Sequence, residues 1–248
     1  MDLGLAGRTY IVTGATSGLG RAAAQSLVDE GARVVISSRS RPRVAAAAAE
    51  LGANATGLTV DNADADAPRQ LIEAAVSRFG RLDGALISVG GPPVGPITGV
   101  TDDQWRSAFE SVFLGAVRLA REVGTQLQAG GAIGLVLSSS VKTPISNLSI
   151  SNGLRPGLAM LAKDLADELG PSGVRVFGMV PGRILTERIR QLERDDPAAR
   201  ARSEAVIPLR RLGKPEEFGA MAAVLLSPAA SYLTGCLVPI DGGMLRSL

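Results

Sequence analysis

Residue types that commonly carry chemistry or covalent links are scarce in this chain. Its 248 residues include no histidine, which removes the commonest metal ligand and the commonest general base. Cys236 is the single cysteine, so the chain can form neither an internal disulfide nor a Cys-x-x-Cys site. Aromatic residues make up only 3% of the chain and offer few platforms for stacking nucleic-acid bases. We therefore predict that the protein has no metal site.

Long apolar runs and a strong excess of one charge are also missing. No apolar run approaches the roughly 18 residues that suggest a membrane span. The first residues, Met1 to Gly4, are not the basic segment that precedes the apolar core of a signal peptide. The net charge is only +2, and the arginines are dispersed. We therefore expect a cytoplasmic protein that binds neither a membrane nor nucleic acid.

What the chain does contain is an alternation of short apolar runs and Ala-rich helical stretches. Fully apolar strands separated by helices predict an α/β fold, a Rossmann-type doubly wound parallel sheet with helices on both faces. The expected strands are Thr9–Thr13, Ala32–Ser37, Ala55–Val60, Gly84–Ser88, Gly134–Ser138, Arg175–Val180 and Leu237–Ile240. The expected helices are Gly18–Glu30, Arg41–Leu51, Ala65–Phe79, Thr101–Ala129, Ile150–Leu169 and Pro215–Leu226.

No Pro-, Gly- or Ser-rich linker divides the chain, so we predict one domain over residues 1–248. Residues 183–209 interrupt the alternation with a charged, arginine-rich segment. Ligands of doubly wound sheets bind beyond the carboxyl ends of the strands, so an insertion at this place predicts a substrate lid.

A glycine loop follows the first expected strand and opens the first helix. Gly14 permits a tight turn, Gly18 lets the backbone approach a pyrophosphate, and Gly20 lets the helix pack closely on the strand. The N–H groups at the helix start then face two phosphates. The alternative is an ordinary glycine turn. The residues predicted to bind a dinucleotide here are Gly14, Thr16, Ser17, Gly18, Leu19 and Gly20.

The end of the second strand indicates which dinucleotide binds. An acidic residue there would bind the adenosine ribose hydroxyls, but Ser38 occupies that place and Arg39 follows it. A guanidinium can bind a 2′-phosphate, and Arg41 and Arg43 add positive charge. We predict NADP as the cofactor in preference to NAD; the alternative is a solvated basic turn.

The third strand ends in Asp61 and Asn62. The Asp61 carboxylate can accept a hydrogen bond from the adenine amino group, or it can cap the following helix. We include both residues in the predicted cofactor site.

Together these motifs resemble those of the classical short-chain dehydrogenase/reductase family, over residues 5–243. The resemblance extends to Leu82-Asp83, Trp105, Pro181-Gly182, Arg211-Leu212-Gly213-Lys214-Pro215-Glu216-Glu217, Tyr232-Leu233-Thr234-Gly235 and Asp241-Gly242-Gly243. It implies a seven-stranded parallel sheet, a nicotinamide cofactor, hydride transfer at a carbonyl carbon and a homotetramer. The tetramer would place Cys236 and Asp241–Gly243 in or beside a subunit interface.

The resemblance also assigns the nicotinamide end of the cofactor site. The family's fourth-strand motif Asn-Asn-Ala-Gly corresponds here to Ser88-Val89-Gly90-Gly91, and Ser88, Val89 and Gly90 are assigned to the cofactor. The segment after the sixth strand would position the carboxamide through Pro181, Gly182, Ile184 and Thr186. A plain strand-ending turn is the alternative for Pro181 and Gly182.

The catalytic positions depart from the family. Val112 replaces the helix asparagine, Ser138 matches the serine, and Ser151 and Arg155 stand where the Tyr-x-x-x-Lys pair is expected. A serine hydroxyl is far less acidic than a tyrosine, and an arginine does not relay protons. We predict catalytic roles for Ser138, Ser151 and Arg155, with Arg155 also reaching the nicotinamide ribose. The alternatives are a backbone-bonded Ser138 and an ordinary helix start with an ion-paired arginine.

The lid carries Arg188, Arg190, Arg194, Arg200 and Arg202, interspersed with Glu187, Glu193, Asp195, Asp196 and Glu204. These arginines suit an anionic small-molecule substrate, but the interspersed acidic residues favour a solvated helical face. The leading prediction is an NADP-dependent oxidoreductase acting on a carbonyl or alcohol. The rivals are a catalytically silent cofactor-binding protein and an enzyme that uses this fold for elimination or isomerisation.

Overall fold

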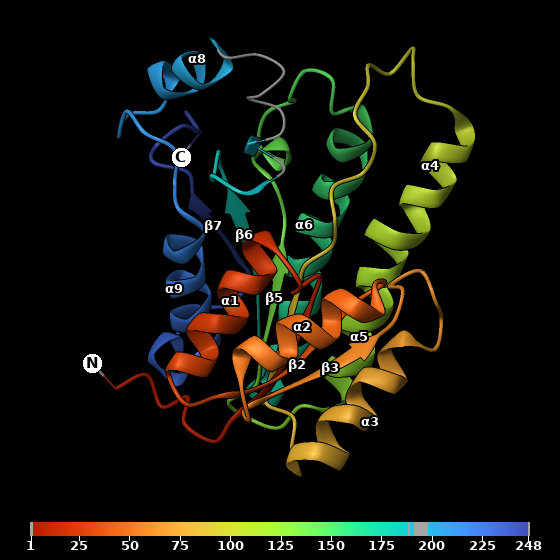
Figure 1. Ribbon diagram of the computed structural model, residues 1–248, viewed down its shortest axis with the longest axis vertical. Helices are drawn as coiled ribbons and strands as arrows, with labels where there is room; N and C mark the ends of the chain where they lie inside the picture. The colour runs from red at the N-terminus through yellow and green to blue at the C-terminus, as the bar shows by residue number, and fades with distance from the viewer. Residues whose placement is uncertain (1, 188, 191–197, 248) are drawn as a thin grey trace.

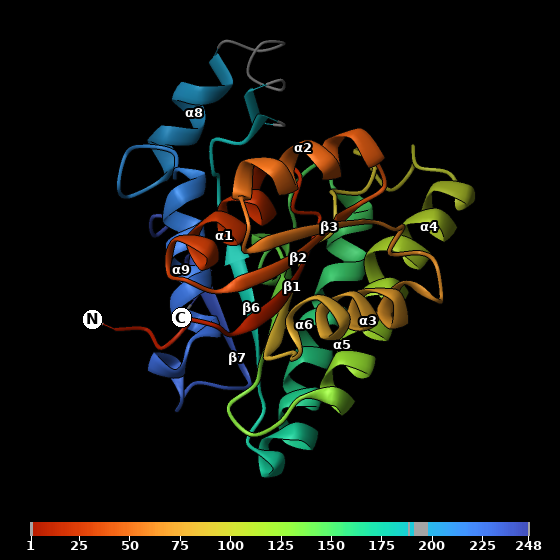
Figure 2. The ribbon, with the colours of Figure 1, turned by 60° about the horizontal axis from the view of Figure 1, so that its bottom comes forward.

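The computed structural model describes residues 2–187, 189–190 and 198–247. Seven strands in this part of the chain form one parallel sheet in the order β3-β2-β1-β4-β5-β6-β7 (Figures 1 and 2). They are β1 (Thr9–Thr13), β2 (Arg33–Ser38), β3 (Ala55–Thr59), β4 (Gly84–Ile87), β5 (Ala132–Val136), β6 (Arg175–Pro181) and β7 (Cys236–Ile240). The order confirms the doubly wound fold predicted from the alternating pattern.

Helices cover both faces of the sheet, as Figure 2 shows. One face carries α1 (Gly18–Asp29), α2 (Arg41–Leu51) and α9 (Pro215–Leu226), and the other carries α3 (Ala67–Phe79), α5 (Gly115–Gln126) and α6 (Ser149–Leu169). Two further helices are α4 (Asp102–Ala108), which continues into α5 through a π-helical turn, and α8 (Ala198–Val206) in the predicted lid. No helix in the described residues is long and apolar enough to cross a membrane.

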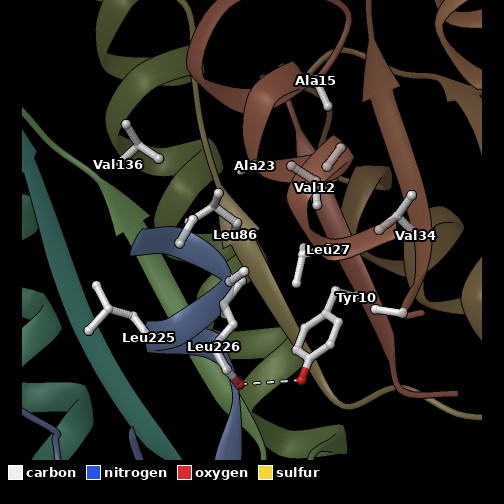
Figure 3. Close-up of a cluster of buried hydrophobic side chains, with 14 of the residues drawn as sticks. Tyr10, Val12, Ala15, Ala23, Leu27, Val34, Leu86, Val136, Leu225 and Leu226 are labelled. Atoms are coloured by element: carbon white, nitrogen blue, oxygen red, sulfur yellow. Dashed lines mark hydrogen bonds between the residues drawn. The ribbon is translucent and has the colours of Figure 1, made fainter. Parts of the chain in front are cut away.

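The central strands are apolar throughout because each of their faces supports a separate core. On β1, Tyr10 and Val12 point toward α1 and α9, whereas Ile11 points toward the helices on the opposite face. Figure 3 shows the first of these cores, where Tyr10 and Leu226 lie side by side. Burying a large apolar side chain contributes roughly 1.5–3 kcal/mol, so the two cores hold the sheet between its helix layers.

The chain reverses its direction of travel across the sheet at β1, which pairs with β2 on one side and β4 on the other. The Thr13 hydroxyl joins the ends of β1 and β4, because it donates to the Ser88 carbonyl at 2.7 Å and accepts from the Ser88 N–H at 2.9 Å. A switch point of this kind opens a crevice at the carboxyl edge of a parallel sheet. The fold therefore places the ligand site above β1, β2 and β4.

The sequence predicted all seven strands, with errors mainly at the ends of elements. The fifth strand is Ala132–Val136 rather than Gly134–Ser138, because Ser138 already caps a 3-10 turn over Ser139–Val141. The expected helix over residues 101–129 is two helices around the π-helical turn Phe109–Leu114, and it ends at Gln126 because Leu127 is extended. Helix α8 was not predicted as an element of its own.

Candidate cofactor cleft and active site

The glycine loop has the backbone shape that its sequence predicts. Gly14 has φ +59°, and a β-carbon there would lie 2.6 Å from the Ser88 carbonyl oxygen. A β-carbon on Gly20 would lie 2.6 Å from the Gly14 carbonyl oxygen, so this glycine allows α1 to pack against the loop. Gly18 also has a positive φ of +58°. The loop therefore depends on glycine for conformation at two positions and for close packing at a third.

A cleft of about 660 Å³ lies at the carboxyl ends of β1, β2 and β4. Ten of the residues predicted to bind the cofactor line it: Gly14, Thr16, Ser17, Ser38, Arg39, Asp61, Asn62, Ser88, Val89 and Gly90. They come from four separate segments of sequence, and the fold brings them to one place. Gly18, Leu19 and Gly20 are not in the lining, because they form the first turn of α1. The other predicted cofactor residues outside the lining are Arg155, Pro181, Gly182, Ile184 and Thr186.

The end of the cleft at β2 is positively charged. Arg39 and Arg43 both line it, whereas Arg41, on the same turn of chain, does not. Ser38 occupies the end of the strand, and its hydroxyl accepts a hydrogen bond from the Ser40 N–H at 3.4 Å. Asp61 lies across the cleft, and one of its carboxylate oxygens accepts from the Ala63 N–H at 3.0 Å. Asp61 thus organises its own turn, and its other oxygen makes no such bond.

The segment after β6 crosses above the glycine loop. Gly182 donates its N–H to the Ile240 carbonyl oxygen at 3.0 Å, and a β-carbon on Gly182 would collide with Asp241. Ile184 is buried and pairs with Gly213. The Thr186 methyl would lie 3.5 Å from a β-carbon on Gly18. The structure therefore brings Thr186 to the glycine loop, and it places Pro181 at the end of β6.

The serines after β5 have different surroundings. The Ser138 hydroxyl accepts a hydrogen bond from the Ser140 N–H at 3.1 Å, which is the backbone role raised as the alternative for this residue. The Ser140 hydroxyl instead lies 3.2 Å from the Ser151 hydroxyl. Ser140 and Ser151 are 5% and 4% exposed. The side chain that the fold brings to Ser151 is therefore Ser140 rather than Ser138.

Arg155 lies one helical turn beyond Ser151 on α6 and is buried, not turned to bulk solvent. Its Nη1 donates to the Val136 carbonyl oxygen at 2.7 Å, at the end of β5. Val112 lies in the π-helical turn and lines the cofactor cleft. π-Helical turns are frequent at functional sites, and this one shapes the wall beside the predicted reaction centre.

Comparisons with known proteins agree with this geometry. A family model described as "Enoyl-(Acyl carrier protein) reductase" matches residues 14–245. An uncharacterized oxidoreductase of Mycobacterium tuberculosis is 36% identical over 245 residues, which cover 95% of this chain and 90% of that protein. "Dehydrogenase/reductase SDR family member 4" of Bos taurus is 33% identical over 247 residues, which cover 97% and 88%. The chain belongs to the short-chain dehydrogenase/reductase family.

Solved structures give the same result. L-Sorbose reductase from Gluconobacter frateurii, complexed with NADPH and L-sorbose, superposes with a TM-score of 0.93 at 30% identity, covering 100% of both chains. YwfH, an NADPH-dependent reductase involved in bacilysin biosynthesis, has a TM-score of 0.91 at 25% identity, covering 97% of this chain and 99% of that one. The protein is an oxidoreductase of the short-chain family, whose members bind a nicotinamide cofactor.

The residues of this cleft fit such a cofactor. The N–H groups at the start of α1 are accessible, because Thr186 is the only side chain within 4 Å of a β-carbon built on Gly18. A β-carbon on Gly90 would meet nothing within 4 Å, so there is open space beside it as well. Backbone N–H groups and the hydroxyls of Thr16 and Ser17 can supply neutral hydrogen-bond donors to phosphates. We find no conflict between the cleft and a dinucleotide.

The tyrosines of this chain lie away from the family's catalytic position. Tyr10 is fully buried in the core under α9, where its hydroxyl donates to the Leu226 carbonyl oxygen at 3.3 Å, and burial raises its pKa to about 12 (Figure 3). Tyr232 is fully exposed before β7. With no histidine in the sequence, neither usual source of a proton lies beside Ser151.

The predicted lid is attached to the body at both ends. Leu185 donates to the Gly213 carbonyl oxygen at 2.8 Å, and Leu209 donates to the Gly242 carbonyl oxygen at 3.3 Å. Two of its arginines form ion pairs with glutamates one turn away, Arg190 with Glu187 at 3.7 Å and Arg200 with Glu204 at 3.0 Å. Arg188, Arg194, Glu193, Asp195 and Asp196 lie outside the described residues.

Sequence reasoning missed Ser140 and Asn152. The family resemblance selected Ser138, and only the 3-10 turn shows that the Ser140 hydroxyl is the one beside Ser151. The Asn152 side chain clamps Ile145 by accepting from its N–H at 3.0 Å and donating to its carbonyl oxygen at 2.9 Å. The run of three serines, Ser138 to Ser140, was the signal that more than one hydroxyl was available there.

Proposed function

We propose that this protein is an NADP-dependent oxidoreductase that acts on a small carbonyl or alcohol substrate through an active site that departs from the family's. The observation that carries the choice of cofactor is the charge at the β2 end of the cleft. Arg39 and Arg43 line it, and Ser38 stands where a carboxylate would bind a ribose with free hydroxyls. The printed description of the L-sorbose reductase complex, which holds NADPH, supports the same choice.

We assign the following binding and catalytic roles to residues of the site. The loop from Gly14 to Gly20 would present its N–H groups to the two phosphates, and Arg39 would hold the 2′-phosphate. Asp61 and Asn62 would contact the adenine, while Ser88 to Gly90, Pro181, Gly182, Ile184 and Thr186 would fix the nicotinamide. When bound, the nicotinamide supplies or accepts a hydride. Ser138, Ser151 and Arg155 remain the predicted groups around the substrate.

Titration with NADPH and with NADH, followed by fluorescence or calorimetry, tests the cofactor. We expect NADPH to bind more tightly, and we expect Arg39→Ala to weaken NADPH by about tenfold or more while leaving NADH almost unchanged, because a hydrogen bond to a charged group contributes about 1.5–3 kcal/mol. Arg41→Ala is the matched control, since it removes an equal charge outside the cleft lining. Equal affinities for the two cofactors would contradict the proposal.

The lid over residues 183–209 is proposed to close on the substrate. An anionic substrate would find cations there, although the pairing of Arg190 and Arg200 with neighbouring glutamates favours a solvated face. The family resemblance also supports a homotetramer and, with the sequence, a cytoplasmic location. The position of β7 is an argument for this assembly. It is the last strand in the sheet order, so its outer edge is unpaired within the sheet, and half-buried Cys236 begins it.

Sedimentation at micromolar concentration tests the assembly. We expect a tetramer whose interface includes Cys236 and the turn Asp241–Gly243, because an unpaired strand edge is normally covered or paired. A monomer would contradict this expectation.

A further inference from the structure

A second cavity, of about 550 Å³, lies beside the ends of β6 and β7 and the start of α9. In Figures 1 and 2 this side of the molecule carries α8, α9 and β7, opposite α4. Apart from Ile184, no residue that lines the cavity belongs to the predicted cofactor-binding or catalytic residues. Small-molecule sites typically have volumes of about 300–1,000 Å³. The cavity is therefore large enough for a ligand other than the dinucleotide.

Part of the cavity wall is apolar. Ile184 follows β6, Ile240 ends β7 and Met221 lies on α9, and all three pack together in the core on this face of the sheet. Leu209, which follows α8, also lines the cavity but is 63% exposed. Its backbone is fixed all the same, because its N–H donates to the Gly242 carbonyl oxygen at 3.3 Å. An apolar ligand beside Leu209 would remove this surface from water, which favours binding.

The two carboxylates of the lining are already satisfied by the protein. The Asp241 oxygens accept backbone N–H groups, from Gly243 at 2.8 Å and from Leu245 at 2.7 Å. Glu217 accepts two hydrogen bonds from the Arg211 guanidinium, at 2.8 Å and 2.6 Å. The charge of Arg211 is therefore balanced within the wall, and neither carboxylate depends on a cation from a ligand.

Arg183 and Lys214, the other two charged side chains of the lining, have no such partners. In the part of the chain that the structure describes, neither the Arg183 guanidinium nor the Lys214 ammonium forms an ion pair or a hydrogen bond. Two backbone hydrogen bonds hold their segments together: Gly213 donates to the Arg183 carbonyl oxygen at 3.0 Å and accepts from the Leu185 N–H at 2.8 Å. The cavity thus has unbalanced positive charge beside an apolar wall, which attracts an anion.

We propose that this cavity binds an organic monocarboxylate with an apolar body. The carboxylate lies at Arg183 and Lys214, whose N–H groups are donors suited to its two oxygens. The apolar body lies against Ile184, Leu209 and Met221. A small inorganic anion would leave the apolar wall in water, and a neutral hydrocarbon would leave both cations unpaired. A ligand with both parts satisfies both kinds of wall.

This site is separate from the dinucleotide cleft and does not depend on the proposed function. Ile184 lines the cavity on the side of α9, whereas Thr186, two residues further on, lies beside Gly18 in the glycine loop. The rest of the two linings is disjoint. We therefore expect the carboxylate and NADPH to bind at the same time.

Calorimetric titration with octanoate tests the site. We expect saturable binding of one octanoate per chain and no comparable binding of octan-1-ol or inorganic phosphate, which keep only the chain or only the charge. Butanoate should bind about tenfold or more weakly than octanoate, because each buried methylene adds to the affinity. Saturating NADPH should change the octanoate affinity by less than about twofold.

Charge-removing variants locate the carboxylate. Arg183→Met and Lys214→Met keep an unbranched apolar side chain, and each should weaken octanoate by about threefold to tenfold, because a charge pair at an exposed position contributes modestly. Leu209→Ser should weaken it by a similar factor through the loss of apolar area. Arg246→Met is the matched control, since Arg246 is exposed, lies outside the lining and removes the same charge.

The absence of saturable octanoate binding, equal binding of octan-1-ol, or equal losses in Lys214→Met and Arg246→Met would overturn the proposal. Competition between octanoate and NADPH would place the carboxylate in the cofactor cleft and would also overturn it. Asp241–Gly243 belongs to the proposed subunit interface as well, so sedimentation of Arg183→Met and Lys214→Met accompanies the titration. We expect both variants to keep the wild-type assembly. Dissociation of these variants would assign the two cations to the partner subunit and overturn the site.

Discussion

The two ends of the ligand site differ in how closely they follow the short-chain family. At the dinucleotide end, the positive φ at Gly14 and Gly18 and the close approach of Gly20 produce the family's loop. At the reaction end, the sequence resemblance places Ser151 and Arg155, both on α6, where the family has its tyrosine and lysine, and we therefore propose that the chemistry differs there. Phosphate binding uses backbone N–H groups and a helix start, whereas proton transfer depends on the pKa of one side chain.

This contrast shows that a protein with the family's dinucleotide loop need not catalyse the family's reaction. The sheet positions both ends of the ligand site, but only the dinucleotide end relies mainly on backbone N–H groups. On the proposed assignment, the residue at position 151 decides whether the second end can supply a proton; its hydroxyl lies 3.2 Å from that of Ser140. The fold can therefore retain its cofactor while the reaction it supports changes.

The largest expected effect comes from restoring the family's proton donor. Ser151→Tyr combined with Arg155→Lys and Val112→Asn should raise the rate of reduction of simple ketones, because general acid catalysis typically contributes 10²–10⁴-fold, or roughly 3–5 kcal/mol of barrier. NADPH consumption by both proteins on one panel of carbonyl compounds measures it. Wild-type turnover of simple ketones at the rate of the triple variant would show that another residue supplies the proton.

The single variants serve as its controls. Arg155→Lys alone adds a titratable ammonium without a phenol, and it should leave ketone reduction slow. Val112 lines the cleft and Arg155 is predicted to reach the nicotinamide ribose, but Arg155→Lys keeps a charged donor, so the affinity for NADPH measured by titration should change little. A large loss of NADPH binding in the triple variant would mean that the two ends are not separable.

The next largest effect is expected at the dinucleotide end. Gly14→Ala should destabilise the loop by about 2–4 kcal/mol and abolish tight NADPH binding, because its β-carbon would approach the Ser88 carbonyl oxygen to 2.6 Å at a φ of +59°. Thermal unfolding and cofactor titration measure the two losses. Gly170→Ala is the control, since a β-carbon there meets nothing within 4 Å, and it should change stability by less than about 1 kcal/mol. Equal losses in the two variants would contradict this account.

The smallest effect at neutral pH concerns Tyr10, which lies outside both ends. Tyr10→Phe removes the hydrogen bond to the Leu226 carbonyl oxygen and should cost about 1 kcal/mol of stability. Cofactor binding and turnover should not change, because this tyrosine is not the proton donor. A loss of turnover with intact stability would reverse that conclusion.

The free energy of unfolding of the wild-type protein should fall at high pH because of Tyr10. Burial raises the folded-state pKa of Tyr10 to about 12, above the usual tyrosine value of about 10. The native state therefore keeps the proton longer than the unfolded state does. The corresponding stabilisation is complete below pH 10 and is lost as the pH rises toward 12, by on the order of 3 kcal/mol. Unfolding by denaturant from pH 9 to pH 12 should show a steeper loss in the wild-type protein than in Tyr10→Phe.

The sequence by itself determined the elements and the dinucleotide loop. Most of the strands are rich in apolar residues, and Gly14, Gly18 and Gly20 follow the first strand at fixed spacing. Both signals are local, since burial sets the composition of a strand and the φ of a glycine is a property of that residue. These local signals locate the ends of the strands, and the sheet topology then brings ten of the predicted cofactor residues to one cleft.

Only the tertiary structure decided which hydroxyl meets Ser151. Ser138 and Ser140 are both close in sequence to the expected place, and the 3-10 turn over Ser139–Val141 turns the first toward backbone and the second toward α6. It also decided that the long helix contains a π-helical turn at Val112 and that Asn152 clamps Ile145. These features depend on how segments that are distant in sequence pack against one another. Residue spacing along the chain does not show that packing.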